Sequence, residues 1–460
     1  MRPELLKPFQ KDGVRQIRQF GFRCLLADEQ GLGKTIQALF VLLKRPDLRP
    51  AFIICPASLK YNWQAEAKLH FNQHIEVLEG RKASAKSIDP NGIYVLNYEI
   101  AFAWREVIRY RKAATVIFDE AHKIKNPETQ QSRAVLYIAK TARMALALSG
   151  TPMTNRPIEL WPTLNVVRPD LFPSREKFAW RYCKPVFTRW GWQYTGATRM
   201  GELHKILKKE VMVRRLKADV LPELPAKQRR VVPFKLDSYR EYRRAQNQFL
   251  EWLKNLDPVK AKRAKKSQGL TKVGYLLRLV SELKRKWVVS WIQDFLEGGE
   301  EKLVAFTCQT AVVDTLIKEF KDEVVFIDGR VTRPQERHNA VRLFQTNPAK
   351  RLFVGNVFAA GTGLTLTAAS NVAFLDLPHT PGDLAQGEDR CHRIGQKRKV
   401  TIHYLITLDT IEEKLCSIIQ AKSKILSAVM DGGEMEHDLD IYSELITSLK
   451  DGNSQTSPKA

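Results

Sequence analysis

The chain contains ten short apolar runs of three to five residues that alternate with longer helix-forming stretches. Five runs lie near the start and five follow residue 300, and each ends in a polar or glycine-rich turn. This alternation is typical of a parallel sheet covered by helices on both faces, so its occurrence in two blocks predicts two α/β lobes. The runs are residues 24–27, 52–55, 94–96, 116–118 and 145–148 in the first block and 303–306, 324–327, 352–354, 372–375 and 401–405 in the second.

The stretch between the two blocks breaks the alternation and is rich in aromatic and basic residues. We therefore expect a first lobe over residues 1–154, a mostly helical insertion over 155–286, a second lobe over 287–430 and a partly disordered polar tail over 431–460. The apolar runs are of strand length, far below the roughly 18 residues that a membrane span needs. No membrane association is expected.

The chain is strongly basic, with 75 Lys and Arg residues against 50 Asp and Glu residues and a formal net charge of +25. Such an excess attracts a polyanion and releases its counterions on contact, so nucleic acid is the predicted partner, ahead of a basic surface that serves solubility alone. A solvated helix face explains a local basic cluster as well as nucleic-acid contact does, and both interpretations stay open. Basic clusters occur at residues 284–286 and, most densely, at Lys260, Lys262, Arg263, Lys265 and Lys266.

A glycine-rich loop follows the first apolar run and has the sequence ADEQGLGKT at residues 27–35. A strand leads into this loop and helix-forming residues follow it, so backbone N–H groups and a helix N-terminus converge on one anion site. Lys34 would neutralise the β- and γ-phosphates of a nucleotide, and the Thr35 hydroxyl would bind Mg²⁺. Asp28 stands where the strict G-x-x-x-x-G-K-[ST] pattern has its first glycine.

A second acidic motif, TVIFDEAH at residues 115–122, ends a buried strand of the same predicted lobe. Asp119 can hold Mg²⁺, while Glu120 can orient and deprotonate the attacking water. A chance acidic pair at a strand end would explain this motif if it stood alone. Because the phosphate loop precedes it in the same lobe, the two motifs together predict hydrolysis of a nucleoside triphosphate.

The second lobe contains the run QGEDRCHRIGQ at residues 386–396. Arg390 and Arg393 are three residues apart and would share one face if this stretch were helical. Arginines so placed can stabilise the charge that develops on a transferred phosphoryl group. From these residues alone, however, a surface pair bound to neighbouring carboxylates is the better interpretation.

These motifs together resemble the Swi/Snf family of DNA-dependent ATPases within helicase superfamily two, and the resemblance covers nearly the whole chain. Gln30 differs from the methionine that is usual in the family's phosphate loop. The matching segments are PFQKDGV at 8–14, LADEQGLGKTIQ at 26–37, CPASLKYNW at 55–63, LSGTPMTN at 148–155, DG at 328–329, GTGLT at 361–365 and QGEDRCHRIGQ at 386–396.

The resemblance implies an α/β fold of two RecA-like lobes with a helical insertion, ATP and Mg²⁺ as cofactors, and a finger role for both arginines. Lys34, Asp119, Glu120, Arg390 and Arg393 are then the catalytic residues, and Thr35 and Asp119 hold the metal. The nucleotide would be bound by Gln10, which reads adenine, and by Asp28, Gly31, Gly33, Lys34, Thr35 and Gln386. The DNA backbone would be contacted by Lys60, Gly150, Thr151 and Gly363.

Within the family, the chain is most similar to the branch of annealing helicases related to HepA. The likeness lies between the two lobes, at RYC (181–183), WGWQY (190–194), GEL (201–203), VMVRRLKADVL (211–221) and LPAKQR (224–229), and in the branch-typical Thr365. We interpret Trp190, Trp192 and Tyr194 as part of the insertion's core in preference to a base-stacking surface.

The resemblance implies an ATP-dependent translocase on duplex or forked DNA that anneals strands, remodels forks or displaces bound proteins. ATP would draw the arginines of the second lobe toward the first and close the cleft, and hydrolysis would release them. Two alternatives stay open: a strand-separating DNA or RNA helicase of the Asp-Glu-Ala-His type, and a DNA-binding module without hydrolysis. The chain is expected to be monomeric, and a loading or single-strand-binding protein is a possible partner.

The adenine-reading segment begins almost at Met1. From this compact architecture we expect an intracellular protein of a bacterial, archaeal or viral-host cytoplasm rather than of a nucleus.

Overall fold

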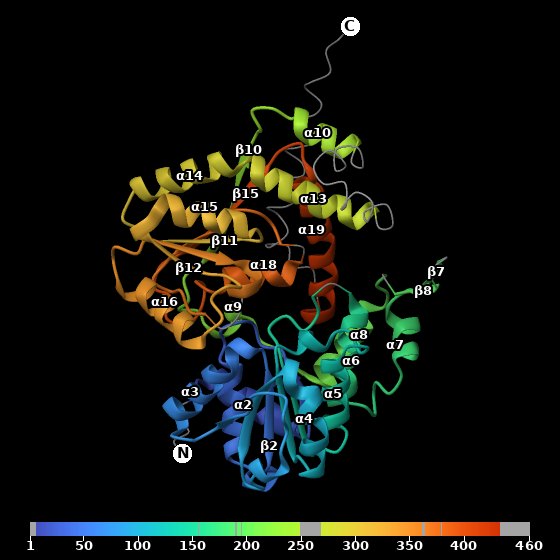
Figure 1. Ribbon diagram of the computed structural model, residues 1–460. Coiled ribbons are helices and arrows are strands. Elements are labelled where there is room, and N and C mark those ends of the chain that lie inside the picture. Colours follow the sequence, from blue (N-terminus) through green and yellow to red (C-terminus); the bar gives the residue numbers. More distant parts are fainter. Residues whose placement is uncertain are drawn as a thin grey trace. The chain divides into compact units, whose positions relative to one another are not determined.

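The computed structural model describes residues 6–154, 156–188, 191–194, 196–248, 268–360, 364–378 and 380–432. The chain divides into two compact units, one formed by residues 1–224 with 424–434 and the other by residues 225–423 with 435–460. Each unit is built around its own parallel sheet (Figure 1). The two units are described separately below.

The first unit contains a seven-stranded sheet in the order β3-β4-β2-β5-β6-β1-β9, and all neighbouring strands are parallel. A separate antiparallel hairpin pairs β7 (Val186–Thr188) with β8 (Gly191–Gln193). The strands of the large sheet are β1 (Arg23–Leu26), β2 (Ala51–Cys55), β3 (Glu76–Val77), β4 (Ile93–Asn97), β5 (Thr115–Asp119), β6 (Met144–Leu148) and β9 (Met212–Val213).

Helices cover both faces of this sheet because successive strand residues point to opposite sides. Phe52 and Ile54 enter one core with residues of α4, α5, α6 and α8, whereas Ile53 enters the other core with residues of α1, α2 and α3. The helices of this unit are α1 (Pro8–Gln19), α2 (Lys34–Leu43), α3 (Lys60–Phe71), α4 (Tyr98–Tyr110), α5 (Gln130–Ala139), α6 (Trp161–Val167), α7 (Arg175–Tyr182), α8 (Met200–Glu210) and α9 (Lys217–Val220).

The second unit contains a six-stranded parallel sheet in the order β10-β15-β14-β11-β13-β12. Its strands are β10 (Lys227–Phe234), β11 (Leu303–Thr307), β12 (Val324–Ile327), β13 (Leu352–Asn356), β14 (Asn371–Phe374) and β15 (Val400–Thr407). Its helices are α10 (Arg240–Asn247), α13 (Gln268–Leu283), α14 (Arg285–Glu297), α15 (Thr310–Phe320), α16 (Pro334–Thr346), α17 (Val357–Ala360) and α18 (Pro381–Glu388), and α19 (Ile411–Met430) begins in this unit and ends in the first.

The fold class expected from the sequence is confirmed, since both units are parallel sheets with helices on both faces. All ten apolar runs form strands, namely β1, β2, β4, β5 and β6 in the first unit and β11 to β15 in the second. Strands β3, β9 and β10 and the β7–β8 hairpin were not expected. Within the part of the chain that the structure describes, no helix combines the length and the apolar character needed to cross a bilayer.

The stretch assigned to a helical insertion, residues 155–286, is divided between the units. Its first part contributes α6 to α9 and edge strand β9 to the first unit, and the chain passes to the second unit between Leu224 and Pro225. Strand β10 then pairs with β15 along eight residues and forms the edge of the second sheet. This stretch therefore supplies one edge strand to each sheet.

Candidate functional site

The phosphate loop connects the end of β1 to the start of α2, which begins at Lys34. Gly31 and Gly33 have φ angles of +84° and +75°, a left-handed conformation that glycine adopts without steric cost. A Cβ atom on Gly33 would lie 2.5 Å from Nε2 of Gln10. Lys34 Nζ donates hydrogen bonds to the carbonyls of Asp28 (2.7 Å) and Glu29 (3.2 Å), so its ammonium group lies inside the loop.

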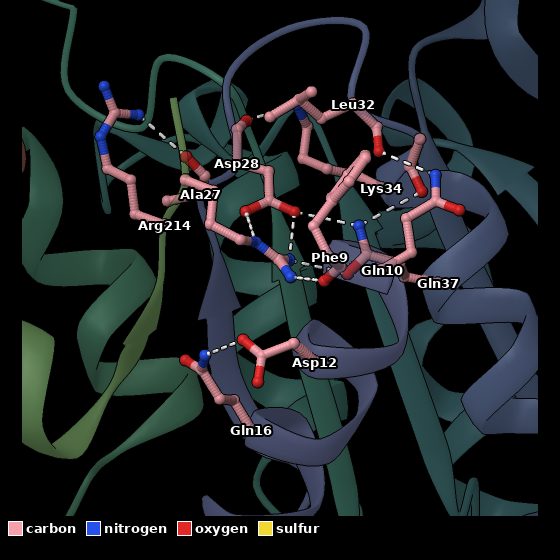
Figure 2. A network of polar contacts seen from close by, with 12 residues as sticks. Phe9, Gln10, Asp12, Gln16, Ala27, Asp28, Leu32, Lys34, Gln37 and Arg214 are labelled. Carbon is pink, nitrogen blue, oxygen red and sulfur yellow. Dashed lines mark hydrogen bonds and ion pairs between the residues drawn. The ribbon is translucent and has the colours of Figure 1, made fainter. Parts of the chain in front are cut away.

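Asp28 is fully buried and its carboxylate is held by two side chains from elsewhere in the first unit. Arg215 Nε and Gln37 Nε2 each donate to it at 2.9 Å. Arg215 also donates to the carbonyl of Phe9 and to Gln37 Oε1, and Figure 2 shows Asp28, Phe9 and Gln37 meeting at this point below the loop. The residue that replaces the first glycine of the usual pattern is therefore fixed by contacts within the protein.

Arg215 was not among the expected site residues. The only sequence signal for it was its place in the run VMVRRLKADVL, to which no role was attached. Its neighbour Arg214 donates to the carbonyl of Ala27 at 2.8 Å (Figure 2). The two arginines that follow β9 therefore hold the first two residues of the phosphate loop.

Gln10 lies in α1 against the same loop and is 4% exposed. Its Nε2 donates to the carbonyl of Leu32 at 3.1 Å (Figure 2). Its Oε1 accepts from the backbone N–H of Lys7 at 3.0 Å. These bonds fix the amide beside the phosphate loop. Its expected contact with adenine stays a prediction.

Asp119 is the last residue of β5 and Glu120 follows it, and both lie beside the loop. Asp119 accepts hydrogen bonds from Trp63 Nε1 (3.0 Å) and from the backbone N–H of Glu120 (2.9 Å), while Glu120 Oε2 lies 3.4 Å from His122 Nδ1. Burial, and after it the charge of Glu120, raises the pKa of the Asp119 carboxyl group. Burial likewise lowers the pKa of Lys34, against the opposing charges of Glu120, Asp28 and Asp119. Lys34, Asp119 and Glu120 thus lie within one electrostatic neighbourhood.

The residues around the loop fit a nucleotide that carries a divalent cation. Burial and the neighbouring charge of Glu120 raise the pKa of Asp119. A bound cation would offset both effects and lower that pKa again. The Nε2 atom of Gln30, in the phosphate loop, is buried and has no hydrogen-bond partner among the described residues. No group of three or more His, Cys, Asp or Glu side chains able to hold a metal occurs in the described ranges. The buried carboxylate of Asp119 suits Mg²⁺, which binds through one or two carboxylates, substrate phosphates and water.

The segment at residues 149–151 lies between the phosphate loop and the acidic motif. A Cβ atom on Gly150 would lie 2.7–2.9 Å from side-chain atoms of Gln30, so only glycine lets the two segments approach this closely. The Ser149 hydroxyl accepts from the backbone N–H of Thr151 at 3.2 Å and lies 3.4 Å from His122 Nδ1. This segment therefore contacts both parts of the candidate site.

The expected DNA contacts are only partly placed. Lys60 is buried, 8% exposed, with its Nζ 3.5 Å from Glu79 Oε1, and its contact with DNA stays a prediction, as do those of Gly150 and Thr151. Of the second basic cluster, Lys284 is 1% exposed and ion-paired with Glu412 at 2.7 Å, so this residue belongs neither to a solvated helix face nor to an exposed nucleic-acid contact, the two interpretations that were left open. Gly363, Lys260, Lys262, Arg263, Lys265 and Lys266 lie outside the described residues.

In the second unit, helix α18 ends at Glu388, so Arg390 and Arg393 lie in turns and not on a helical face. They nevertheless converge, because Nη1 of each donates to the carbonyl of Leu364, at 3.2 Å and 3.0 Å. Arg390 Nε also donates to the carbonyl of Gln386 at 2.8 Å. We call residues 386–396 the arginine loop.

Glu388 is the buried centre of this loop and was not expected as a functional residue. Its carboxylate accepts from Lys227 Nζ (2.8 Å), from Arg229 Nε (2.8 Å) and Nη2 (2.7 Å), and from the hydroxyl of Tyr404. Burial acts to raise the pKa of Glu388, but the charges of Arg229 and Lys227 outweigh it and hold the pKa well below its ordinary value. Glu388 thereby joins the arginine loop to β10 and β15.

The far end of the arginine loop is closed by Gln396. Its Nε2 donates to the carbonyl of Ala369 at 2.8 Å, and its Oε1 accepts from the backbone N–H groups of Lys397 and Arg398 at 2.9 Å. Gly395 adopts φ +98°, a conformation that requires glycine in this tight turn. The Ile-Gly-Gln ending that resembled the family pattern therefore has a structural role in fixing the loop.

Comparisons with known proteins agree with this geometry. The SNF2-related domain model matches residues 9–288, and the helicase conserved C-terminal domain model matches residues 286–395. Two parallel-sheet units with a phosphate loop, an acidic motif and an arginine loop define a helicase-type ATP hydrolase, as the sequence predicted. The chain belongs to the SNF2-related family.

Curated relatives show the same family. The SWI/SNF-related matrix-associated actin-dependent regulator of chromatin subfamily A-like protein 1 of Xenopus tropicalis is 35% identical over 437 residues, which cover 92% of this chain and 44% of that protein. The DNA annealing helicase and endonuclease ZRANB3 of Homo sapiens is 32% identical over 447 residues, which cover 94% of this chain and 41% of that protein. The chain spans less than half the length of these relatives. A solved SWI2/SNF2 ATPase core of Sulfolobus solfataricus in complex with dsDNA matches with a TM-score of 0.44 and 25% identity over 96% of each chain.

The expected compartment is overturned by these relatives. They come from a frog and from human, and a further relative, 32% identical over 443 residues, comes from the nematode Caenorhabditis elegans. The name of the first refers to chromatin, which is found in nuclei. The expectation of a bacterial, archaeal or viral-host cytoplasm in preference to a nucleus is therefore wrong. It rested on where the sequence begins, which carries no information on compartment.

Proposed function

We propose that this chain is an ATP-dependent translocase on double-stranded DNA that reads no base sequence. The observation that carries the proposal is that Lys34, at the start of α2, lies close to Asp119 and Glu120 at the end of β5. The net charge of +25 supports a nucleic-acid track. The name of the human relative, a DNA annealing helicase, supports strand annealing as the work that hydrolysis drives.

In this proposal, ATP provides the phosphoryl group and Mg²⁺ the charge that neutralises its oxygens. Lys34 exchanges the carbonyls of Asp28 and Glu29 for phosphate oxygens, and the Thr35 hydroxyl and the Asp119 carboxylate hold the metal. Glu120 orients water and accepts its proton. His122, 3.4 Å from Glu120, restricts the position of that carboxylate.

The arginine loop would complete the site when the second unit meets the nucleotide. Arg390 and Arg393 already converge on one carbonyl, so both guanidinium groups can be directed at one phosphate. Fixed positive charge of this kind contributes roughly 10³–10⁵ in rate. ATP would favour approach of the two units and hydrolysis would reverse it, so that one cycle advances the chain along the DNA backbone.

DNA contact would be made largely to phosphates, because the family resemblance assigns contact with the DNA backbone to the segments at residues 55–63, 148–155 and 361–365. Phosphate contacts carry no base information and release counterions. We therefore expect binding that tolerates any sequence and weakens steeply with salt. A monomer is the proposed form, and a single-strand-binding protein is a proposed partner during annealing.

The test is phosphate release from ATP without nucleic acid and with duplex DNA, forked DNA, single-stranded DNA or RNA. Duplex or forked DNA should stimulate the wild type, and Glu120→Gln should lower stimulated release at least about 100-fold because the general base is lost. Glu128→Gln, at an exposed carboxylate outside the site, is the matched control and should behave like the wild type.

Stimulation by RNA or single strands alone would point to a strand-separating helicase, and no hydrolysis with any of these would point to a binding module. Annealing is tested on complementary strands held apart by a single-strand-binding protein. ATP-dependent reannealing by the wild type but not by Glu120→Gln is the expected result. Displacement of a paired strand in its place would contradict the annealing role.

A further inference from the structure

Three aromatic side chains form an exposed group on the first unit, which we call the aromatic cluster: Trp180, Phe187 and Trp192. Trp180 lies on α7, and Phe187 and Trp192 face each other across the β7–β8 hairpin. The Trp192 ring centroid lies 4.9 Å from that of Trp180 and 5.1 Å from that of Phe187. Despite these mutual contacts, the three residues are 51%, 67% and 49% exposed, respectively.

The aromatic cluster is separate from the hydrophobic core beneath it. Phe178 and Tyr182, one turn apart on α7, are buried in that core, whereas Trp180 lies on the opposite side of the helix. Tyr194 is partly buried and packs against the core. The interpretation of these aromatic residues as insertion core therefore holds for Tyr194 and is wrong for Trp192, and Trp190 lies outside the described residues.

The segment that carries the aromatic cluster is rich in positive charge. Its described residues between 173 and 200 include one acidic residue, Glu176, and five basic residues: Arg175, Lys177, Arg181, Lys184 and Arg199. Arg181 is ion-paired with Glu202 at 2.7 Å, whereas Lys177 and Lys184 are exposed and have no ion pair within the described ranges. The same segment therefore carries solvated cations as well as exposed aromatic rings.

We propose that the aromatic cluster binds unpaired bases of single-stranded DNA at the edge of a duplex. Nonspecific single-strand sites combine aromatic rings, on which bases stack, with cations that follow the phosphate backbone, and both are present here. Bases inside a duplex are already stacked on each other, so this surface selects the unpaired arm of a fork. That the ligand is DNA and not RNA rests on the proposed function.

The charge distinguishes this ligand from an apolar protein segment. Large exposed aromatic groups also mark protein interfaces, but an apolar segment gains nothing from the excess of basic residues in the segment that carries the rings. A polyanion whose bases offer flat apolar faces satisfies both features at once. The edge-to-face contacts of Trp192 hold its ring in place before a ligand binds, which reduces the entropy lost on binding.

The test is equilibrium binding of the full chain, by fluorescence anisotropy at fixed salt, to a duplex with a single-stranded arm. The same duplex with an abasic arm of equal length keeps the phosphates but removes the bases. The wild type should bind the base-bearing arm about tenfold more tightly than the abasic arm. The Phe187→Ala/Trp192→Ala variant should bind both equally.

Single substitutions at Trp192 distinguish stacking on an aromatic ring from contact with any apolar side chain. Trp192→Phe keeps an aromatic face and should retain most of the preference, whereas Trp192→Leu keeps only apolar area and should lose it. Tyr110→Ala, at a residue of the first unit that is 75% exposed outside the aromatic cluster, is the matched control and should leave the preference unchanged.

Equal binding of base-bearing and abasic arms by the wild type would overturn the inference, as would an unchanged preference in Trp192→Leu. Phosphate release stimulated by blunt duplex is measured on the same samples and should be retained by the double variant. Failure of the wild type to hydrolyse ATP would count against the proposed translocase alone, because the comparison of arms requires only binding.

Discussion

The phosphate loop of the first unit and the arginine loop of the second are each held by a buried carboxylate and basic residues of the stretch 211–234. Asp28 is paired with one cation among the described residues, Arg215, whereas Glu388 is paired with two, Lys227 and Arg229. A buried charge that loses its only partner is strongly destabilising, but a second cation can substitute for the first. The two loops should therefore differ in their tolerance of substitution.

The largest effect is expected for Arg215→Met. Asp28 is fully buried and, among the described residues, would keep only the neutral Gln37 as a side-chain partner. The free energy of unfolding of the first unit should fall by about 3–5 kcal/mol. Hydrogen exchange of the full chain, read by mass spectrometry on peptides from β1 and β5, measures this loss while peptides from β15 report the second unit in the same sample.

The matched control is the double variant Asp28→Asn/Arg215→Met, which removes both charges. It should recover part of the lost stability, since no uncompensated buried charge remains. A double variant less stable than Arg215→Met would show that the pair acts through packing and not through charge.

A smaller effect is expected for Arg229→Met, because Lys227 still neutralises Glu388 at 2.8 Å. The loss should be about 1.5–3 kcal/mol, the contribution of hydrogen bonds to a charged group. Protection of peptides from α18 and β15 is the measurement. Removing Lys227 as well should bring the loss of stability up to that of Arg215→Met. If Arg229→Met alone already costs this much, Lys227 does not compensate for the loss of Arg229.

The same two loops show what could be predicted from sequence. Lys34, Asp119 and Glu120 could be assigned to one site region because each belongs to a short motif at a strand end. The structure brings them together, and their catalytic roles stay predictions. Arg215 and Arg229 were not found, because their carboxylates lie 187 and 159 residues away in the sequence. A local pattern cannot specify such a partner.

The strands, too, were predictable where the signal is local and not where it depends on a distant partner. All ten apolar runs were recognisable because a strand covered on both faces is apolar along its whole length. Strand β10 has the sequence KQRRVVPF and only intermediate or exposed residues, and its strand geometry depends on pairing with β15. Lys284 is a further example. The basic run at residues 284–286 does not reveal that one of its members is buried and paired with Glu412.

The stability contributed by Glu388 in the second unit and by Asp119 in the first should depend on pH in different ways. The pKa of Glu388 is lowered by folding, so its stabilisation is complete above its ordinary value of 4.5 and is lost as the pH falls below it. The pKa of Asp119 is raised by folding, so its contribution is present below its ordinary value of 3.8 and is lost as the pH rises through neutrality. The two carboxyl groups should therefore respond to acid in opposite directions.

Urea denaturation at pH 6 and pH 3.5 tests this for Glu388→Gln against the wild type. The stability gap between them should shrink by about 1 kcal/mol at the lower pH, since one pH unit below the ordinary pKa corresponds to at most about 1.4 kcal/mol. For Asp119→Asn, the variant should gain stability over the wild type as the pH rises. A gap for Glu388→Gln that is constant with pH would mean that its carboxylate is not stabilised by its cations.

The smallest effect is expected for Tyr404→Phe, which removes the hydroxyl that donates to Glu388 Oε1. That oxygen keeps the hydrogen bond from Arg229 Nε, so no buried acceptor is left unsatisfied. The loss should be about 0.5–1 kcal/mol, measured by protection of α18 peptides. In the Arg229→Met background the same substitution should cost more, because the Tyr404 hydroxyl is then the remaining donor to Oε1 of Glu388 among the described residues. Equal losses in the two backgrounds would show that the bonds to Glu388 act independently, and the tolerance of the arginine loop would then come from Lys227 alone.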